Sequence, residues 1–247
     1  MNIGGVSHSF RPFGQPTIRP AILWTRDAAG YPMGSDRGAA QDVYEARVTF
    51  ADTEANLDTL QQTLNANREG VTLSSFSTTG QEIFGPEVNY SGSISATVVD
   101  FGEREHIHFN KVSQLQVTFR ALSPTLLGTT ASLASLRLQE GFTGDQSWDV
   151  AKSFTYSQAA AYKDGRADVG RLSGTFIQKP AEARAILAYL LTTARATAVT
   201  LPTFPGLTYP FGRPKGSGPF NCKITKFEVS RLNLNRWTFK IDFEEAP

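Results

Sequence analysis

The same order of strand-like and helix-like segments occurs twice along this chain of 247 residues. In the first half, strict alternation of apolar and polar residues predicts a strand over Tyr44–Phe50. A capped helix follows over Asp52–Asn67, with its leucines on one face and Gly70 placed to end it. Three further strands are predicted at residues 71–76, 93–99 and 115–121. A repeated unit constrains the architecture more than any single motif, because each copy has an apolar face to bury.

The second half repeats this order of segments. Residues 172–177 predict a strand, and Pro180 is expected at the first position of a helix with Glu182 in its first turn. The apolar face of this helix is broad and consists of Ile186, Leu187, Leu190, Leu191 and Ala194. Three strands are again expected, at residues 199–204, 222–229 and 236–243.

Short sequence matches favour a duplication. Val71-Thr72-Leu73 corresponds to Val199-Thr200-Leu201, and Phe84-Gly85 corresponds to Phe211-Gly212. The alternative is that any two α+β segments look alike at this level. The shared order and the near-constant spacing favour a duplicated unit, so the predicted fold class is α+β, mainly β, with one crossing helix in each unit.

The repeat divides the chain into four parts. The two units are expected at residues 43–122 and 151–247, with a connection at 123–150. Residues 1–42 are left over, and four Pro and six Gly among the first forty residues predict an irregular N-terminal arm. Such an arm is ordered only when it docks on the same chain or on a neighbour.

The charge of the chain is divided unevenly between the two halves. Residues 1–123 contain 9 Lys/Arg and 13 Asp/Glu, a net charge of −4, and residues 124–247 contain 15 and 10, a net charge of +5. The two halves sum to a net charge of +1. A net charge this close to zero gives no general reason to expect nucleic-acid binding. No apolar run approaches the roughly 20 residues that span a bilayer, so membrane insertion is not expected.

Candidate chemical sites are few. Arg104, His106 and His108 share one face of an extended strand and offer two imidazoles to a metal, but a solvated hairpin tip is the competing interpretation. Ser217 lacks the Gly-x-Ser-x-Gly context of an exposed nucleophile. The single cysteine, Cys222, begins an alternating strand and is expected to be an inert small apolar residue. We therefore predict no enzyme activity, no catalytic residues, no metal and no cofactor.

The pattern resembles the distal tail proteins of long-tailed bacteriophages and, more broadly, the tail-tube fold. The resemblance depends on a strand pair with one crossing helix, Asp52–Asn67, and on the closing strands Lys223–Val229 and Trp237–Phe243. It implies two tandem tail-tube-like β-sandwich units. It covers about residues 43–122 and 171–245. It rests on the general pattern of the segments and not on a specific motif. A typical member has one ring-forming domain, whereas both halves here are ring-like.

The resemblance implies a structural part of a phage tail tip or baseplate. Six copies would form a hexameric ring, or three copies a pseudo-hexamer, joining the tail tube protein to the hub and the receptor-binding proteins. DNA would pass through without sequence recognition, and the protein would be a virion component assembled in the bacterial cytoplasm. The expected subunit contacts come from edge strands, the N-terminal arm and the loop 211–220; the candidate contact residues are Phe10, Phe13, Trp24, Phe84, Phe211, Arg213 and Lys215.

Two other interpretations remain open at the level of sequence. One is a carbohydrate- or small-ligand-binding β-sandwich module, in which Trp24, Trp148 or Trp237 is a stacking platform. Trp237 alternates with Phe239 and is expected in the core, so Trp24 is the better candidate for an exposed or docking aromatic. The other is a hydrolase that uses Ser217 or Cys222.

Overall fold

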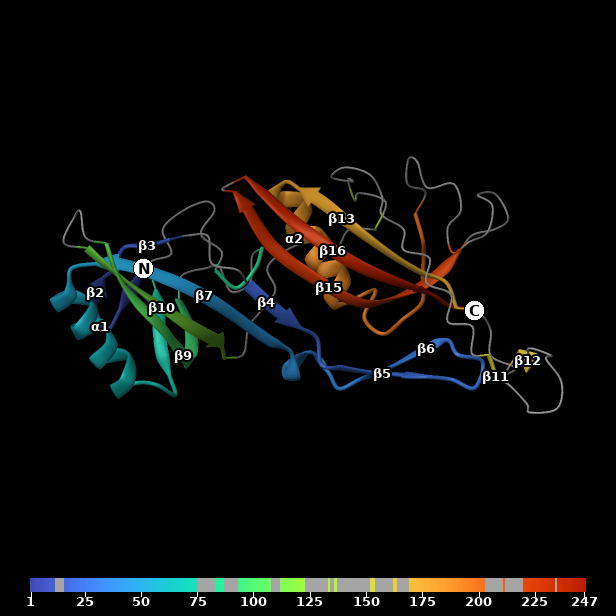
Figure 1. Cartoon of the computed structure of the whole chain (residues 1–247), viewed down its shortest axis with the longest axis horizontal. Helices are drawn as coiled ribbons and strands as arrows, with labels where there is room; N and C mark the ends of the chain where they lie inside the picture. The colour runs from blue at the N-terminus through green and yellow to red at the C-terminus, as the bar shows by residue number, and fades with distance from the viewer. Residues whose placement is uncertain are drawn as a thin grey trace.

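The computed structural model shows a mainly β chain in which two units lie end to end (Figure 1). It describes residues 1–11, 16–74, 83–86, 93–107, 112–122, 133, 136, 152–153, 162–163, 169–202, 211, 220–233 and 235–247, with the backbone alone at residues 10–11, 152–153 and 162–163. The α+β, mainly β class predicted from the sequence is confirmed.

The first unit is an eight-stranded antiparallel sheet. Its order is β2-β1-β8-β9-β10-β7-β3, and β4 also pairs with β7. The strands are β1 (Asn2–Ile3), β2 (Val6–Ser7), β3 (Phe10–Arg11), β4 (Pro16–Arg19), β7 (Val43–Asp52), β8 (Val71–Ser74), β9 (Ser93–Ile107) and β10 (Val112–Ala121). The alternation read from the sequence decides which side faces inward, because Tyr44, Ala46, Val48 and Phe50 of β7 are all buried.

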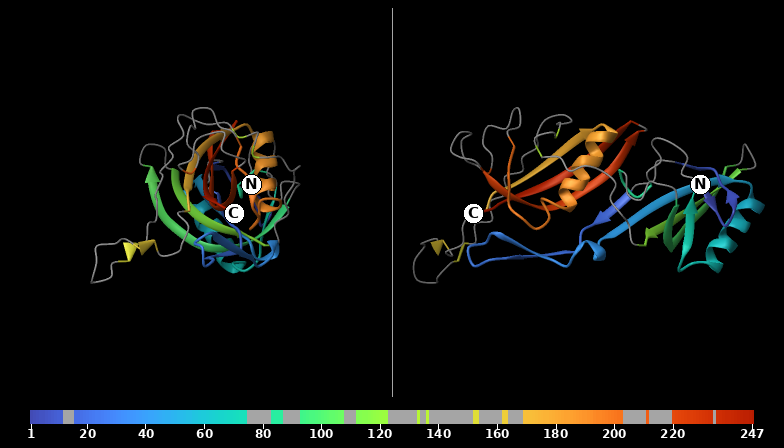
Figure 2. Two further views of the ribbon diagram at one scale, coloured as in Figure 1. Left: turned by 90° about the vertical axis from the view of Figure 1, so that its right-hand side faces the viewer. Right: turned by 180° about the vertical axis from the view of Figure 1, so that it is seen from behind.

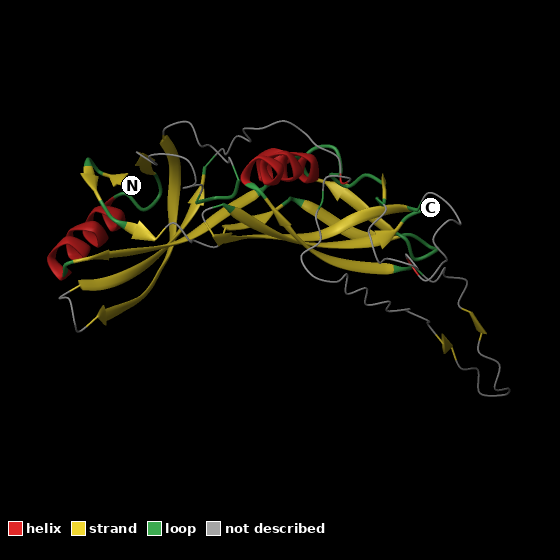
Figure 3. Ribbon diagram, turned by 90° about the horizontal axis from the view of Figure 1, so that it is seen from above, coloured by secondary structure: helices red, strands yellow, loops and turns green. Residues whose placement is uncertain are grey.

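Helix α1 (Glu54–Ala66) packs on one face of this sheet (Figure 3). Its N-cap residue is Thr53, whose hydroxyl accepts a hydrogen bond from the backbone N–H of Asn56. The three leucines predicted for the apolar face, Leu57, Leu60 and Leu64, are buried. The prediction that Gly70 ends the helix is wrong: the helix ends at Ala66 with Asn67 as its cap, and the amide of Gly70 closes a turn onto the Asn67 carbonyl.

The second unit is a four-stranded antiparallel sheet in the order β13-β16-β15-β14. The strands are β13 (Arg171–Gln178), β14 (Val199–Thr200), β15 (Asn221–Asn233) and β16 (Arg236–Glu245). Helix α2 (Pro180–Leu191) covers one face, with Pro180 at its first position and the Glu182 carboxylate accepting from the backbone N–H of Lys179. All five residues predicted for its apolar face are buried.

The two units share their topology. Strands β7-β10-β9-β8 of the first sheet correspond to β13-β16-β15-β14 of the second, and each helix connects the first of these strands to the last. Corresponding residues also pair in the same way. Val71 lies opposite Ala96 as Val199 lies opposite Cys222, and Phe50 lies opposite Leu115 as Phe176 lies opposite Phe239. This agreement supports a duplicated unit. The second sheet that a β-sandwich requires stays a prediction, because each unit is described as one main sheet with a helix on one face.

The two cores are rich in phenylalanine. Phe50 and Phe119 meet edge to face at 6.3 Å between ring centroids, and Phe176 and Phe243 do so at 6.4 Å. Such pairs add about 0.5–1.5 kcal/mol to the effect of burial alone. Trp237 is fully buried, as its alternation predicts, and the Arg231 guanidinium lies 5.4 Å from its ring.

The prediction of an irregular N-terminal arm is wrong. Strands β1 to β4 are part of the first sheet, and Met1 and Ile3 belong to its core. Strands β5 (Ile22–Arg26) and β6 (Pro32–Asp36) then form a hairpin that runs along the second unit (Figures 1 and 2). A short 3-10 helix (Ala39–Gln41) leads from this hairpin into β7. The N-terminal segment is therefore shared between both units.

The described part of the chain has one further small sheet. Strands β11 (Lys152–Ser153) and β12 (Tyr162–Lys163) pair with each other in a separate two-stranded sheet. No helix in the described part of the chain is both long and apolar enough to cross a membrane.

Candidate functional site

The junction of the two units is an ion cluster around Arg195, which follows α2. Its guanidinium donates from Nη1 and Nη2 to the two carboxylate oxygens of Asp42, at 2.7 Å and 2.8 Å, and from Nε to Asp36 at 2.7 Å. The side chains of Arg195 and Asp42 are 6% and 0% exposed. Asp42 directly precedes β7, so this cluster connects the second unit to the first strand of the first unit.

The electrostatics of this cluster favour its charged forms. The hydrogen bonds that Arg195 donates to Asp42 and Asp36 raise the pKa of its guanidinium, and the same contact, with a hydrogen bond from the Gly38 amide, lowers the pKa of the Asp36 carboxyl. The carboxylate of Asp42 also accepts a hydrogen bond from the backbone N–H of Ala21 at 2.7 Å. Loss of either partner of this pair would leave an uncompensated buried charge at the junction.

The β5–β6 hairpin has further polar contacts with the second unit. Arg26 donates to Glu244 at 2.8 Å, and the Lys223 ammonium donates to the Pro32 carbonyl at 2.7 Å. Glu244 also lies 3.6 Å from the Arg171 guanidinium. These contacts hold the hairpin beside the second sheet.

A groove of about 750 Å³ lies where the N-terminal segment meets the second unit. Strand β4 and Pro20, which follows it, form one part of the lining together with β5. Strands β13, β15 and β16 and the end of α2 form the other part. The apolar lining includes Ile18, Ile22, Trp24, Leu190, Phe227 and Val229, and the polar lining includes Thr175, Lys226, Glu228, Ser230, Thr238 and Lys240. Its size is within the range of pockets that bind small molecules.

Trp24 is the half-buried aromatic of this groove. It lies opposite Gly34 in the β5–β6 ladder, and a Cβ atom at Gly34 would lie 2.9 Å from Cζ3 of the indole and 2.9 Å from the Cβ atom of Ala196. Glycine is therefore required here, because the indole rests on the backbone of the opposite strand. The sequence predicted Trp24 as an exposed or docking aromatic, and the structure places it against the second unit with one part lining the groove.

The charges of the groove are only partly paired. Lys226 and Glu228 form an exposed ion pair at 2.7 Å, and this hydrogen bond lowers the pKa of Glu228. Lys240 lies opposite Glu228 on one side and Thr175 on the other in the sheet. Within the described part of the chain, Lys240 has no hydrogen bond or ion pair of its own.

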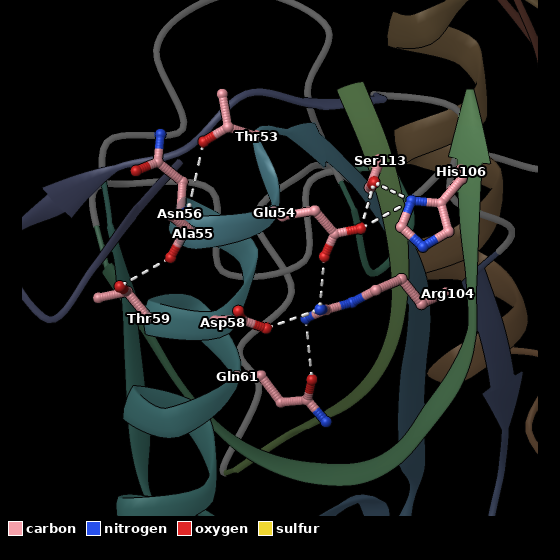
Figure 4. A network of polar contacts seen from close by, with 10 residues as sticks. All are labelled: Thr53, Glu54, Ala55, Asn56, Asp58, Thr59, Gln61, Arg104, His106 and Ser113. Atoms are coloured by element: carbon pink, nitrogen blue, oxygen red, sulfur yellow. Dashed lines mark hydrogen bonds and ion pairs between the residues drawn. The ribbon is translucent and has the colours of Figure 1, made fainter. Parts of the chain in front are cut away.

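A second polar cluster joins α1 to the β9–β10 hairpin (Figure 4). Glu54 accepts from Arg104 at 2.9 Å and from Ser113 at 2.7 Å, and it lies 2.7 Å from Nδ1 of His106. Arg104 also donates to Asp58 at 2.6 Å, and this contact is the main cause that raises the pKa of Arg104. The cluster binds the first turn of the helix to the sheet beneath it.

Within the described residues, this cluster does not have the geometry of a catalytic triad or of a metal site. Arg104 and His106 both reach Glu54, as their predicted shared face implies, but His108 lies outside the described residues. Among the residues that the structure describes, no group of three or more His, Cys, Asp or Glu side chains could hold a metal ion. Ser113 and Glu54 both contact the same nitrogen of His106, at 3.0 Å and 2.7 Å. A catalytic triad instead places the nucleophile and the carboxylate on opposite nitrogens.

Cys222 is fully buried, and burial raises the pKa of its thiol to about 12. The thiol is therefore protonated at neutral pH, whereas the nucleophilic form of cysteine is the thiolate. Ser217, the other predicted nucleophile, lies outside the described residues.

The predicted subunit-contact residues have different outcomes. Phe84 and Phe211 are 0% and 1% exposed, so these two are core residues and not surface contacts. Phe211 packs closely on Gly170: a Cβ atom added to Gly170 would lie 2.4 Å from the Cβ atom of Phe211. The backbone of Phe10 pairs with Phe50 in β3. The side chain of Phe10 and all of Phe13, Arg213 and Lys215 lie outside the described residues.

Sequence reasoning missed the junction residues. Arg195 and Asp42 are 153 positions apart in the chain, and neither belongs to a recognisable motif. No local pattern predicts which charged residues from separate units will meet.

A comparison with known proteins finds no family model that matches this chain and no match among the curated proteins.

Proposed function

We propose that the chain is a structural component of a bacteriophage tail tip or baseplate, where copies of it form a ring. The observation that supports this proposal most is the repeated strand–helix–strand–strand–strand topology of two linked units. A chain built twice from one unit supplies ring-forming elements at both of its ends. The ring joins the tail tube to the hub and the receptor-binding proteins, and DNA passes through it without sequence recognition. The mature protein is a virion component.

Unpaired strand edges support this assembly. Within the described part of the chain, β13 pairs only with β16, and β2 pairs only with β1. Val6 of β2 is 51% exposed. Unpaired edges are sites where another copy can add its own strand. Because β2 and β13 belong to different units, their pairing is head to tail, and head-to-tail contacts form a ring when the rotation from one copy to the next closes.

Two stoichiometries satisfy this proposal. Three copies alternate their two units in a pseudo-hexamer, which is the arrangement that pairs β2 with β13. Six copies place one unit of each chain in the ring, with contacts between like units. The net charges of −4 and +5 on the two halves of the sequence favour contacts between unlike units. Alternation of the two units in a trimer brings each acidic half against a basic one.

The edge contacts can be tested with matched surface variants. Val6→Lys and Ile177→Lys put a charge on β2 and on β13, and Leu232→Lys changes a residue of the β15 end that is 50% exposed. Sedimentation velocity should show that the two edge variants lose the ring while Leu232→Lys keeps it, because charged edges resist strand addition. Intact rings in both edge variants contradict the proposed contacts.

A further inference from the structure

We propose that the groove beside Trp24 is a binding site for an acidic saccharide, a sugar ring that bears a carboxylate. This inference is independent of ring formation, since the groove is lined by a single chain. It depends on three features of the lining: a fixed aromatic ring, a set of hydroxyl groups that are in no hydrogen bond within the described residues, and a lysine ammonium group without an ion pair there.

The aromatic ring is held in place before any ligand binds. The indole of Trp24 rests on Gly34 and its hairpin is fixed to the second unit by Arg26 and Lys223. Aromatic side chains bury a large apolar area at low entropic cost, which suits them to the apolar face of a pyranose. Trp24 therefore provides a preorganised stacking platform.

Three hydroxyl groups line the same groove. Thr238 lies directly opposite Ser230 on β15, and Thr175 lies opposite Lys240 in the next row. Within the described residues, the hydroxyls of Thr175, Ser230 and Thr238 are in no hydrogen bond. Each can act both as donor and as acceptor, which matches the hydroxyl groups of a sugar.

The positively charged ammonium group of Lys240 makes the site favour a negatively charged ligand. Lys226 is already bound to Glu228, and Arg19 at the other end is bound to Glu45. Lys240 has no hydrogen bond or ion pair within the described residues, although its charge helps to lower the pKa of Glu228 opposite it. With Arg19, Lys226 and Lys240 against Glu228, the lining has more positive than negative charge. A carboxylate on the ligand pairs with it, and this charge-assisted contact distinguishes an acidic sugar from a neutral one.

Calorimetric titration of the full chain tests the proposal, with tetragalacturonate as the acidic probe and maltotetraose as the neutral one. We expect tetragalacturonate to bind at least about tenfold more tightly than maltotetraose. Trp24→Ala should weaken binding of both saccharides about tenfold or more, and Lys240→Gln should remove the preference for the acidic one. Tyr31→Ala and Lys179→Gln, which lie outside the groove lining, should bind like the native chain.

The outcomes that overturn the proposal are separate from those of ring assembly. Absence of binding of both saccharides at millimolar concentration contradicts it, as does unchanged affinity in Trp24→Ala. Because Trp24→Ala also removes packing on Gly34, Lys240→Gln provides an independent variant at an exposed position. If Lys240→Gln keeps the native preference for tetragalacturonate, the assigned anion contact is wrong.

Discussion

Arg195 and Asp42 form a buried bidentate ion pair between the two units, with both guanidinium–carboxylate distances below 3 Å. Removal of the arginine leaves the Asp42 carboxylate buried without its partner. We predict that Arg195→Ala lowers the free energy of unfolding by about 3–5 kcal/mol, measured by urea denaturation. Lys226→Gln, which breaks an exposed pair, should change the free energy of unfolding far less than Arg195→Ala does. A loss below 1 kcal/mol for Arg195→Ala would show that the junction is not held by this pair.

The same cluster predicts a pH dependence through Asp36. Its pKa is lowered in the folded state from a reference value of 3.8, so its contribution to stability is complete above that value and is lost as the pH falls through the folded pKa. Denaturation with urea between pH 7 and pH 3 should show a smaller acid-induced loss of stability in Asp36→Asn than in the native chain. Equal losses in both proteins would contradict a folded-state role for this carboxylate.

Ile3 tests the finding that the N-terminus belongs to the first core. It is 1% exposed and pairs opposite Leu73 on β8. Ile3→Ala should lower the free energy of unfolding by about 2–5 kcal/mol, because it removes buried apolar volume. Val6→Ala, at a position that is 51% exposed, is the matched control and should stay within about 0.5 kcal/mol. Equal stability of Ile3→Ala and the native chain would contradict the finding that the N-terminus is part of the first core.

Cys222 provides a probe of the second core. Since its thiol is buried and its pKa is raised to about 12, we expect almost no reaction with an aromatic disulfide reagent at pH 8 in the native chain. The same chain in concentrated urea should react with one equivalent. Rapid reaction under native conditions means that the sheet around β15 opens readily.

The long strands could be predicted from sequence because one face of each is buried. In β7 and β16 the alternation of large apolar and polar residues follows directly from that geometry, and Leu57 on α1 follows the helical period. The short strands β1 to β4 have only two to four residues each, which is too few for a periodic pattern. Their pairing depends on neighbours far along the chain.

The candidate site was less predictable. Trp24 was predicted to be an exposed or docking aromatic because it lies in a Pro/Gly-rich segment, and the structure places it half-buried at the groove. Phe84 and Phe211 were misjudged, because burial of a loop aromatic depends on tertiary packing and not on its sequence neighbours. The Arg195–Asp42 pair has no local signal, since its partners come from different units.

The mass of the native particle in solution tests the central proposal most directly. Mass photometry of the purified 26.9 kDa chain, at concentrations up to micromolar with a rapid-dilution step, counts the copies in each particle. A ring predicts particles of three or six copies, with three favouring alternation of the acidic and basic halves. A stable monomer at micromolar concentration would contradict both ring arrangements.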